Sequence, residues 1–369
     1  MALGAYQKIN TVMGGRPFGS GKDGPYSNAA LPGLSFSSCS GSGSTLSVTT
    51  ATFANDELIL VHESRGLSTV GQWEINRVLS GGMSNTLSLY RSLNYTYTDS
   101  GNSQAQCIKI PQYSSFTISG TTSITDWAGD TGGIFIAAVS GIASITGIIS
   151  ADSRGYDGGP GDIGSAGVSH GEGTQGPVVY WPSALQDTGG SGGGKGGGGG
   201  GGGHATSGGN GTGGYEPGYG GDAAGLADLT TMVFGGGGGS GASANEYDGD
   251  GAPGGGILFL IAKTITLTGS ISNYGGTGEN SSNGTGGGGG AGGSVLLVCQ
   301  TATLGSNLIA ATGGSGGTSP NGNGGAGSTG RIAIHYSNSY TGTTNPGLVA
   351  GINAIQDTTL IEGGLAFIL

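Results

Sequence analysis

The sequence predicts an all-β protein, in which a small N-terminal β domain is followed by a glycine-rich repeat module of stacked β-rungs with polyglycine II-type helices. Short strand-like runs, an internal repeat and the glycine content support this fold class. Of 369 residues, 89 are glycine and only 9% are charged. Apolar runs that begin at Gly256, Gly293 and Gly330 are spaced by 37 residues (256 to 293 to 330), which indicates a structural repeat.

Each repeat unit consists of a strand, a turn, a second strand and a glycine-rich excursion. A further copy begins at Gly132-Gly133, 123 residues before the copy at Gly255-Gly256 (132 to 255), so a long insertion separates the two. Apolar residues alternate with period two in these strands, which predicts one inward face per strand. The residues expected to share one continuous core are Ile257, Phe259, Ile261, Val295, Leu297, Ile332 and Ile334.

The glycine tracts, which include the unbroken run Gly196–Gly203, allow two interpretations. Gly/Ser-rich segments are commonly mobile linkers. Alternatively, the tracts form extended helices with three residues per turn, packed so closely that only glycine fits. We favour packed helices, because the tracts recur in phase with the strands and carry almost no charge.

Changes in composition along the chain predict its domain organisation. The N-terminal part is rich in turn residues and then in short strands, whereas glycine dominates from about residue 129. The expected parts are an N-terminal arm (1–35), a small all-β domain for attachment or assembly (36–128), the glycine-rich repeat module (129–336) with its long insertion (160–250), and C-terminal closing strands (337–369).

Charge and cysteine content exclude several classes of partner. Residues 1–109 carry seven basic and six acidic side chains (7 − 6 = +1), and residues 110–369 carry four and sixteen (4 − 16 = −12). This acidic balance argues against nucleic-acid binding. Cys39, Cys107 and Cys299 lack metal-ligand spacing, so we expect buried thiols.

Segments for export or membrane insertion are not recognisable in the sequence. We therefore expect synthesis in the cytosol without a signal peptide, and no membrane insertion. A rigid, weakly charged structural chain of this kind is typical of a virion component.

Residues that could support catalysis or metal binding are scarce. The four histidines are scattered, so we expect no enzyme activity and no cofactor. The carboxylate pairs Asp126/Asp130 and Asp152/Asp157 are candidates for glycan cleavage, although aspartates in glycine-rich turns are commonly structural. Asp248 and Asp250 are weak metal candidates, because their Asp-x-Asp-Gly pattern lacks the acidic residue that closes a calcium loop.

Aromatic side chains in the insertion are the best candidates for binding. Tyrosine and tryptophan offer a large contact area at low entropic cost, and glycine, serine and asparagine around them are typical of adaptable binding loops. Alternatively, the rings cap glycine helices. The receptor-binding candidates are Tyr180, Trp181, His204, Tyr215, Tyr219 and Tyr247.

The alternation of polyglycine with loops bearing aromatic, Asn and Ser residues resembles the glycine-rich adhesins at the tail-fibre tips of tailed phages. The resemblance covers about residues 129–336, including Gly189–Tyr219, Gly235–Gly256 and Gly284–Gly293. It implies packed polyglycine helices whose connecting loops bind the host receptor. The paired apolar strands of each unit depart from this pattern and favour a hybrid with β-rungs.

The resulting expectation is a non-enzymatic virion protein, a fibre or spike component that presents glycine-rich loops to the host surface. Its partners would be other virion proteins, bound through residues 1–128, and a host surface glycan or protein. A homo-oligomer is also expected. Alternatives are a purely structural fibre shaft or capsid decoration without a receptor, and a β-solenoid glycan depolymerase. An ice-binding glycine-helix protein is disfavoured by the irregular loop lengths.

Overall fold

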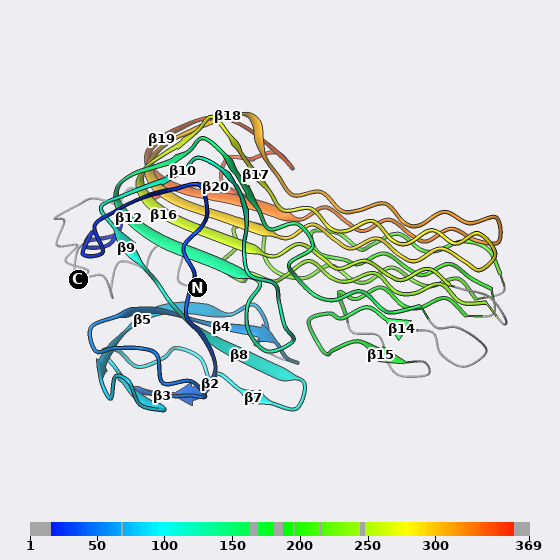
Figure 1. Ribbon diagram of the computed structural model, residues 1–369, viewed down its shortest axis with the longest axis horizontal. Coiled ribbons are helices and arrows are strands. Elements are labelled where there is room, and N and C mark those ends of the chain that lie inside the picture. Colours follow the sequence, from blue (N-terminus) through cyan, green and yellow to red (C-terminus); the bar gives the residue numbers. More distant parts are fainter. Residues whose placement is uncertain are drawn as a thin grey trace.

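A computed structural model of the protein describes residues 16–67, 69–161, 169–180, 187–194, 196–214, 216–243 and 248–357. Regular secondary structure in these residues is entirely β, in agreement with the predicted all-β class. Within the same residues, no helix is long and apolar enough to cross a membrane. Figure 1 shows a barrel, a curled sheet above it and a long bundle of extended chain that leaves the sheet on one side.

The N-terminal strands form a closed barrel. Antiparallel pairing runs through all neighbours, and the contact between the first and last strands closes the barrel with six strands. In spatial order these are β2 (Phe36–Ser42), β3 (Thr45–Val48), β6 (Thr86–Leu89), β5 (Trp73–Ser80), β4 (Leu58–Arg65) and β8 (Ser103–Lys109), with β7 (Asp99–Ser100) added beside β8.

A second sheet of 11 strands, paired in parallel, lies above the barrel. Its strands are β1 (Pro25–Asn28), β9 (Gln112–Tyr113), β10 (Ser115–Ile118), β11 (Thr121–Ser123), β12 (Ile134–Ile145), β13 (Ile148–Ser150), β16 (Ile257–Leu267), β17 (Ser270–Ser272), β18 (Ser294–Ala310), β19 (Arg331–Asn345) and β20 (Ala354–Gln356). A short antiparallel pair, β14 (Ser169–His170) and β15 (Val179–Tyr180), stands apart.

The 37-residue repeat corresponds to strand register. Ile257 at the start of β16 pairs with Ser294 of β18, which pairs with Arg331 of β19. Each partner lies 37 residues further along the chain (257 to 294 to 331), so equivalent positions of successive copies are direct neighbours. The earlier copy joins the same register, with Ile134 beside Ile257.

The predicted fold class, a single module of stacked β-rungs with polyglycine II-type helices, is wrong: the described residues contain no β-solenoid, the repeated strands are neighbours in one curled parallel sheet, and the glycine tracts lie beyond that sheet (Figure 1). The chain bends back at a glycine between β12 and β13 and between β16 and β17. A Cβ on Gly147 would lie 2.1 Å from the carbonyl oxygen of Gly120, and one on Gly269 would lie 1.9 Å from that of Gly147. Glycine at equivalent bends therefore lets the sheet curl without a clash.

The first six residues of β12, β16 and β18 are all buried, so both faces of the sheet are covered there and the predicted single inward face is wrong. Ile257, Phe259 and Ile261 pack towards the barrel, whereas the remaining predicted core residues, Val295, Leu297, Ile332 and Ile334, lie inside the curl of the sheet. The register explains the error, because Ile257 is equivalent to Ser294 and not to Val295. Burial on both faces is usual for parallel strands.

The barrel and the sheet share one hydrophobic core. Trp73 of β5 packs edge-to-face on Phe259 of β16, with ring centroids 5.0 Å apart. A separate cluster fills the barrel interior and includes Cys39 and Cys107. The three cysteines are free and buried, as predicted.

Beyond the strands, extended tracts run side by side and form what we call the glycine bundle (Figure 1). Hydrogen bonds between backbone groups join neighbouring tracts, and few of their residues belong to a strand. The tracts are residues 155–161, 169–174, 188–194, 196–203, 206–212, 216–222, 235–242, 248–255, 273–281, 285–292, 311–318 and 322–330.

The hydrogen bonds of the central tract, residues 196–203, recur every third residue. The amides of Gly198 and Gly201 donate to carbonyl oxygens of tract 206–212, at 2.9 and 2.8 Å. The intervening amides donate to two other tracts, and the carbonyls accept from three more. A period of three residues without internal hydrogen bonds is that of a polyproline II-type helix. The six partners (three acceptors and three donors) are tracts 206–212, 285–292 and 188–194, and tracts 216–222, 235–242 and 322–330.

This packing explains why the central tract is unbroken glycine. A Cβ on Gly200 would lie 1.9 Å from the carbonyl oxygen of Tyr219, and one on Gly201 would lie 2.0 Å from that of Ala326. A tract at the outside of the bundle instead exposes every third residue, as at Tyr274, Thr277 and Asn280. Large side chains are therefore confined mainly to outer positions, whereas the buried positions of the tracts are mostly glycine with a few small residues such as Ser240 and Ala291.

The first and last described strands, β1 and β20, join the sheet and not the bundle. Within the expected N-terminal arm, Pro25–Asn28 forms β1 beside β10. At the other end, β19 crosses the expected boundary at residue 337 and is followed by β20. The strand expected at the very end of the chain, Leu360–Leu369, lies outside the described residues.

Candidate functional site

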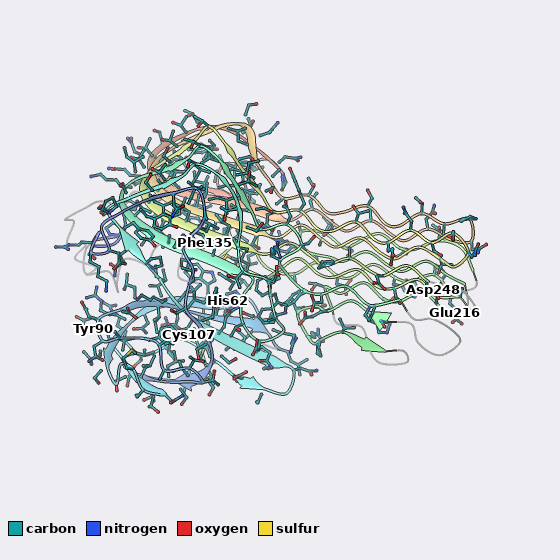
Figure 2. All side chains as sticks on the ribbon, viewed as in Figure 1. His62, Tyr90, Cys107, Phe135, Glu216 and Asp248 are labelled. Carbon is teal, nitrogen blue, oxygen red and sulfur yellow. The ribbon has the colours of Figure 1, made fainter. Side chains whose placement is uncertain are left out.

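The end of the glycine bundle that lies farthest from the sheet is formed by turns between tracts, and we call it the tip (described residues 212–214, 248–250, 279–285 and 317–323). Figure 2 labels Asp248 at this end and Tyr90 of the barrel at the opposite end of the molecule. Asparagine, serine, threonine and proline replace glycine in the two turns that follow tracts 273–281 and 311–318.

Side-chain hydrogen bonds connect these two turns. The carboxamide oxygen of Asn280 accepts from the backbone amide of Thr318 at 2.7 Å and from its hydroxyl at 3.0 Å. The hydroxyl of Ser319 donates to the carbonyl of Gly284 at 2.6 Å. The side-chain NH₂ group of Asn321 in turn donates to the backbone carbonyl of Asn283. The two turns are therefore linked at several points.

A third turn is attached through Thr212 and Asn323. The amide of Thr212 donates to the carbonyl of Asn323 at 2.8 Å, and the amide of Asn323 donates to the hydroxyl of Thr212 at 3.0 Å. Because each turn is held by its neighbours and begins on a bonded tract, the tip presents its side chains in a fixed arrangement.

An open depression of about 620 Å³ lies in the tip. This volume is within the range of about 300–1,000 Å³ typical of small-molecule sites. The described residues that line it include no ionisable side chain; they are Asn280, Ser281, Ser282, Thr318, Ser319, Pro320 and Asn323.

Tyr219 is the predicted binding residue whose exposure is clearest. Its side chain is 65% exposed, while its backbone carbonyl accepts from the amide of Ser191 at 2.9 Å. Tyr180 contributes its backbone to β15, and its side chain is outside the description. Trp181, Tyr215 and Tyr247 also lie outside the described residues.

His204 is not a surface residue, and the prediction that it contacts a receptor is wrong. Its side chain is fully buried, with Nε2 3.1 Å from the carbonyl of Val233 and 3.0 Å from the hydroxyl of Ser294. Burial, aided by the charge of Arg331, lowers its pKa from 6.5 to about 3. A neutral His204 therefore helps to join the bundle to the start of β18.

Asp248 and Asp250 hold backbone amides in the tip. Asp248 accepts from the amides of Ser243, at 2.7 Å, and Thr285, at 3.1 Å, and Asp250 accepts from the amide of Gly161. No group of three or more His, Cys, Asp and Glu side chains suited to a metal ion occurs in the described part of the chain. These contacts give the two aspartates a structural role.

Carboxylates considered for glycan cleavage are also engaged in structural contacts. Asp126 forms an ion pair with Arg154. Asp152 accepts from the amide of Tyr274 at 2.6 Å and from the hydroxyls of Ser150 and Ser272 at 2.9 and 2.7 Å. Asp152 thus ties neighbouring copies of the repeat together.

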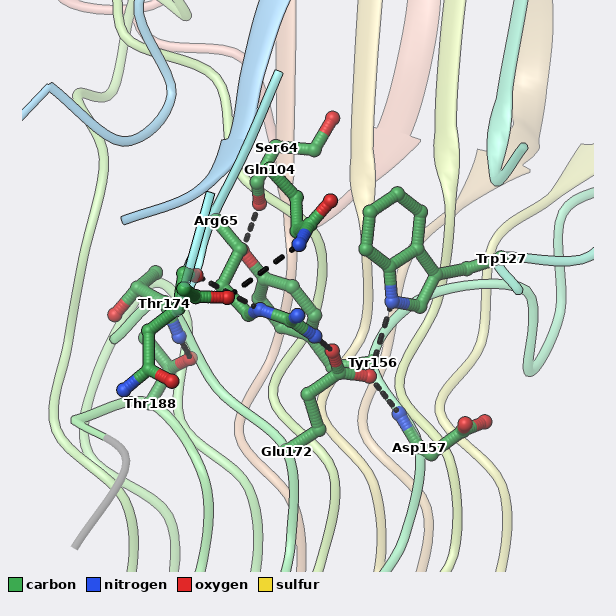
Figure 3. A network of polar contacts seen from close by, with 11 residues as sticks. Ser64, Arg65, Gln104, Trp127, Tyr156, Asp157, Glu172, Thr174 and Thr188 are labelled. Carbon is green, nitrogen blue, oxygen red and sulfur yellow. Dashed lines mark hydrogen bonds and ion pairs between the residues drawn. The ribbon is translucent and has the colours of Figure 1, made fainter. Parts of the chain in front are cut away.

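A buried polar network joins the barrel to the base of the bundle (Figure 3). Arg65, at the end of β4, forms an ion pair with Glu172, and their side chains are only 6% and 2% exposed. The same carboxylate accepts from the indole N–H of Trp127 and the amide of Asp157, each at 3.0 Å. Burial raises the pKa of Glu172, while Arg65 and these hydrogen bonds oppose that shift.

Sequence reasoning missed the residues of the tip depression because it gave priority to aromatic side chains. The sequence feature that could have identified them is a pair of polar segments, 279–283 and 318–323, that interrupt the glycine tracts. Both contain asparagine and serine, and the second also contains proline, which is typical of turns. Comparisons of the chain with models of known protein families, with curated proteins and with solved structures find no match.

Proposed function

We propose that the chain is a non-enzymatic virion protein, a component of a phage fibre or spike whose glycine bundle carries the tip towards the host surface. The observation that carries this proposal is a stem of mutually hydrogen-bonded tracts that ends in cross-linked polar turns. A stem of this kind holds its end group in place without a large hydrophobic core, because each tract is bonded to its neighbours.

The barrel is the proposed contact with other virion proteins. Leu79, Met83 and Tyr90 are 58%, 65% and 57% exposed around the β5–β6 hairpin, and Tyr90 lies at the opposite end of the molecule from the tip (Figure 2). Exposed apolar residues are common at interaction sites. This arrangement supports a division between an assembly end and a recognition end, and other copies of the chain are among the proposed assembly partners.

Imaging of intact particles tests this proposal. Electron cryomicroscopy of particles that carry the chain should place the barrel against the particle and the tip outwards. An antibody fragment against residues 279–285 should then block attachment to cells, whereas one against the barrel should not reach its epitope. A tip buried in the assembly would instead favour the alternative of a shaft or capsid decoration without a receptor.

A further inference from the structure

The two asparagines of the tip depression have fixed amide orientations. Backbone N–H groups can only donate, so the atom of Asn280 that faces the amide of Thr318 is its carboxamide oxygen. The same reasoning applies to Asn323, whose carboxamide oxygen accepts from the amide of Ser319 at 2.8 Å. The oxygens are therefore used within the protein, and no acceptor among the described residues is bonded to the NH₂ groups, which leaves them available as donors.

The other residues that line the depression determine which class of ligand it can bind. Serine and threonine hydroxyls both donate and accept, and Pro320 adds an apolar surface. Among the described residues, no cation lines the depression to pair with a phosphate or carboxylate. The carboxylate of Glu279, which precedes Asn280 and is exposed, disfavours anions further, as does the net charge of −11.

These features match a neutral ligand with many hydroxyl oxygens. We propose that the tip depression binds a neutral saccharide, with the NH₂ groups of Asn280 and Asn323 donating to sugar oxygens and Pro320 packing against the sugar ring. This inference rests on the proposed recognition role and names the ligand class of the tip. The linked turns hold the donors in place before binding, which reduces the entropic cost of association.

Aspartate substitutions test the proposed donors directly. Asn280→Asp and Asn323→Asp keep the oxygen that accepts from the backbone but replace each NH₂ group by an acceptor oxygen. The matched control is Asn210→Asp, because the carboxamide oxygen of Asn210 likewise accepts from a backbone amide, that of Gly220 at 2.9 Å, and Asn210 does not line the depression. The melting temperature of each variant reports whether the fold is retained.

Binding of the full chain is measured on immobilised neutral oligosaccharides and on acidic ones that contain uronic or sialic acids. The wild-type protein and Asn210→Asp should bind a neutral oligosaccharide. Asn280→Asp and Asn323→Asp should each weaken that binding by about tenfold or more, because the sugar oxygen then loses its hydrogen-bond donor and meets an acceptor oxygen. Failure to bind any neutral oligosaccharide, or unchanged binding by both folded variants, would overturn the inference.

A parallel attachment assay separates this inference from the proposed function. The labelled wild-type chain is applied to a panel of bacterial strains that have been treated with periodate, which oxidises sugars, or with a protease. Loss of attachment after periodate supports a saccharide ligand. Attachment that is lost only after protease treatment and is retained by both variants contradicts the saccharide but keeps the recognition role. Absence of attachment to every strain counts against both.

Discussion

Arg65 and Glu172, which lie 107 residues apart in the chain, form a buried ion pair that fixes the glycine bundle to the barrel. Next to this pair, the amide of Gly66 donates to the carbonyl of Thr174 at 2.7 Å, and the hydroxyl of Tyr156 donates to the carbonyl of Ser64. These contacts together hold the base of the glycine bundle against the end of β4 in the barrel.

Breaking this pair should destabilise the protein strongly. Glu172→Gln leaves the buried charge of Arg65 without its counter-ion, and we expect a loss of about 3–5 kcal/mol in the free energy of unfolding. Asp56→Asn is the control, because Asp56 pairs with Arg77 at the surface, where a loss of about 0–1 kcal/mol is expected. Denaturant unfolding measures both, and equal losses would contradict a structural role for the buried pair.

Packing in the bundle should make the central glycines irreplaceable. Gly200→Ala places a Cβ 1.9 Å from a backbone oxygen, so a neighbouring tract must move and a loss of about 3 kcal/mol or more is expected. Gly33→Ala is the control, because a Cβ there meets nothing within 4 Å. Thermal unfolding compares the two variants, and a Gly200→Ala protein as stable as wild type would show that the tracts are loosely packed.

Both faces of β16 should be sensitive to truncation. Phe259→Ala creates a cavity between the sheet and the barrel, and Leu260→Ala creates one inside the curl. Losses of about 3–5 and 2–5 kcal/mol are expected. Ile142, which is 55% exposed, provides the control, with a loss of about 0.5 kcal/mol or less for Ile142→Ala. If Leu260→Ala alone left the stability unchanged, only the face of β16 that carries Phe259 would be buried, as the sequence pattern predicted.

His204 should make stability depend on pH. Because its pKa is lowered from 6.5 to about 3 in the folded protein, the unfolded chain takes up a proton first. Its stabilising contribution is present above pH 6.5 and is lost as the pH falls from 6.5 towards 3, by up to about 1.4 kcal/mol per pH unit. The free energy of unfolding of wild type relative to His204→Gln should therefore decrease from pH 7 to pH 5. Parallel pH profiles would exclude this contribution.

Much of the repeat architecture could be predicted from sequence, because spacing in the chain equals register in the sheet. The 37-residue period placed Ile257, Ser294 and Arg331 at equivalent positions, and the structure pairs them. The curl could not be predicted, since it depends on glycines such as Gly147 meeting the backbone of a strand far away in the sequence. An alternating pattern also cannot distinguish one buried face from two when nearly every residue is apolar.

The candidate site was less accessible to sequence reasoning. In the sequence, His204 is followed by small and polar residues of the kind common in exposed loops, yet tertiary packing places its side chain in the interior. Asn280 and Asn323 are adjacent only because the tracts that carry them end at the same corner of the bundle. Local sequence contains no information on which turns between glycine tracts meet.

Hydrogen exchange of the amides in Gly196–Gly203 tests the central claim most directly, which is that the glycine tracts form a bonded stem. Each amide from Gly198 to Gly203 donates to a neighbouring tract at 2.8–3.0 Å, so exchange measured by mass spectrometry on this segment should be slowed many-fold relative to an unstructured peptide of the same sequence. Exchange at the unstructured rate would show that the tracts are mobile linkers and that nothing holds the tip in place.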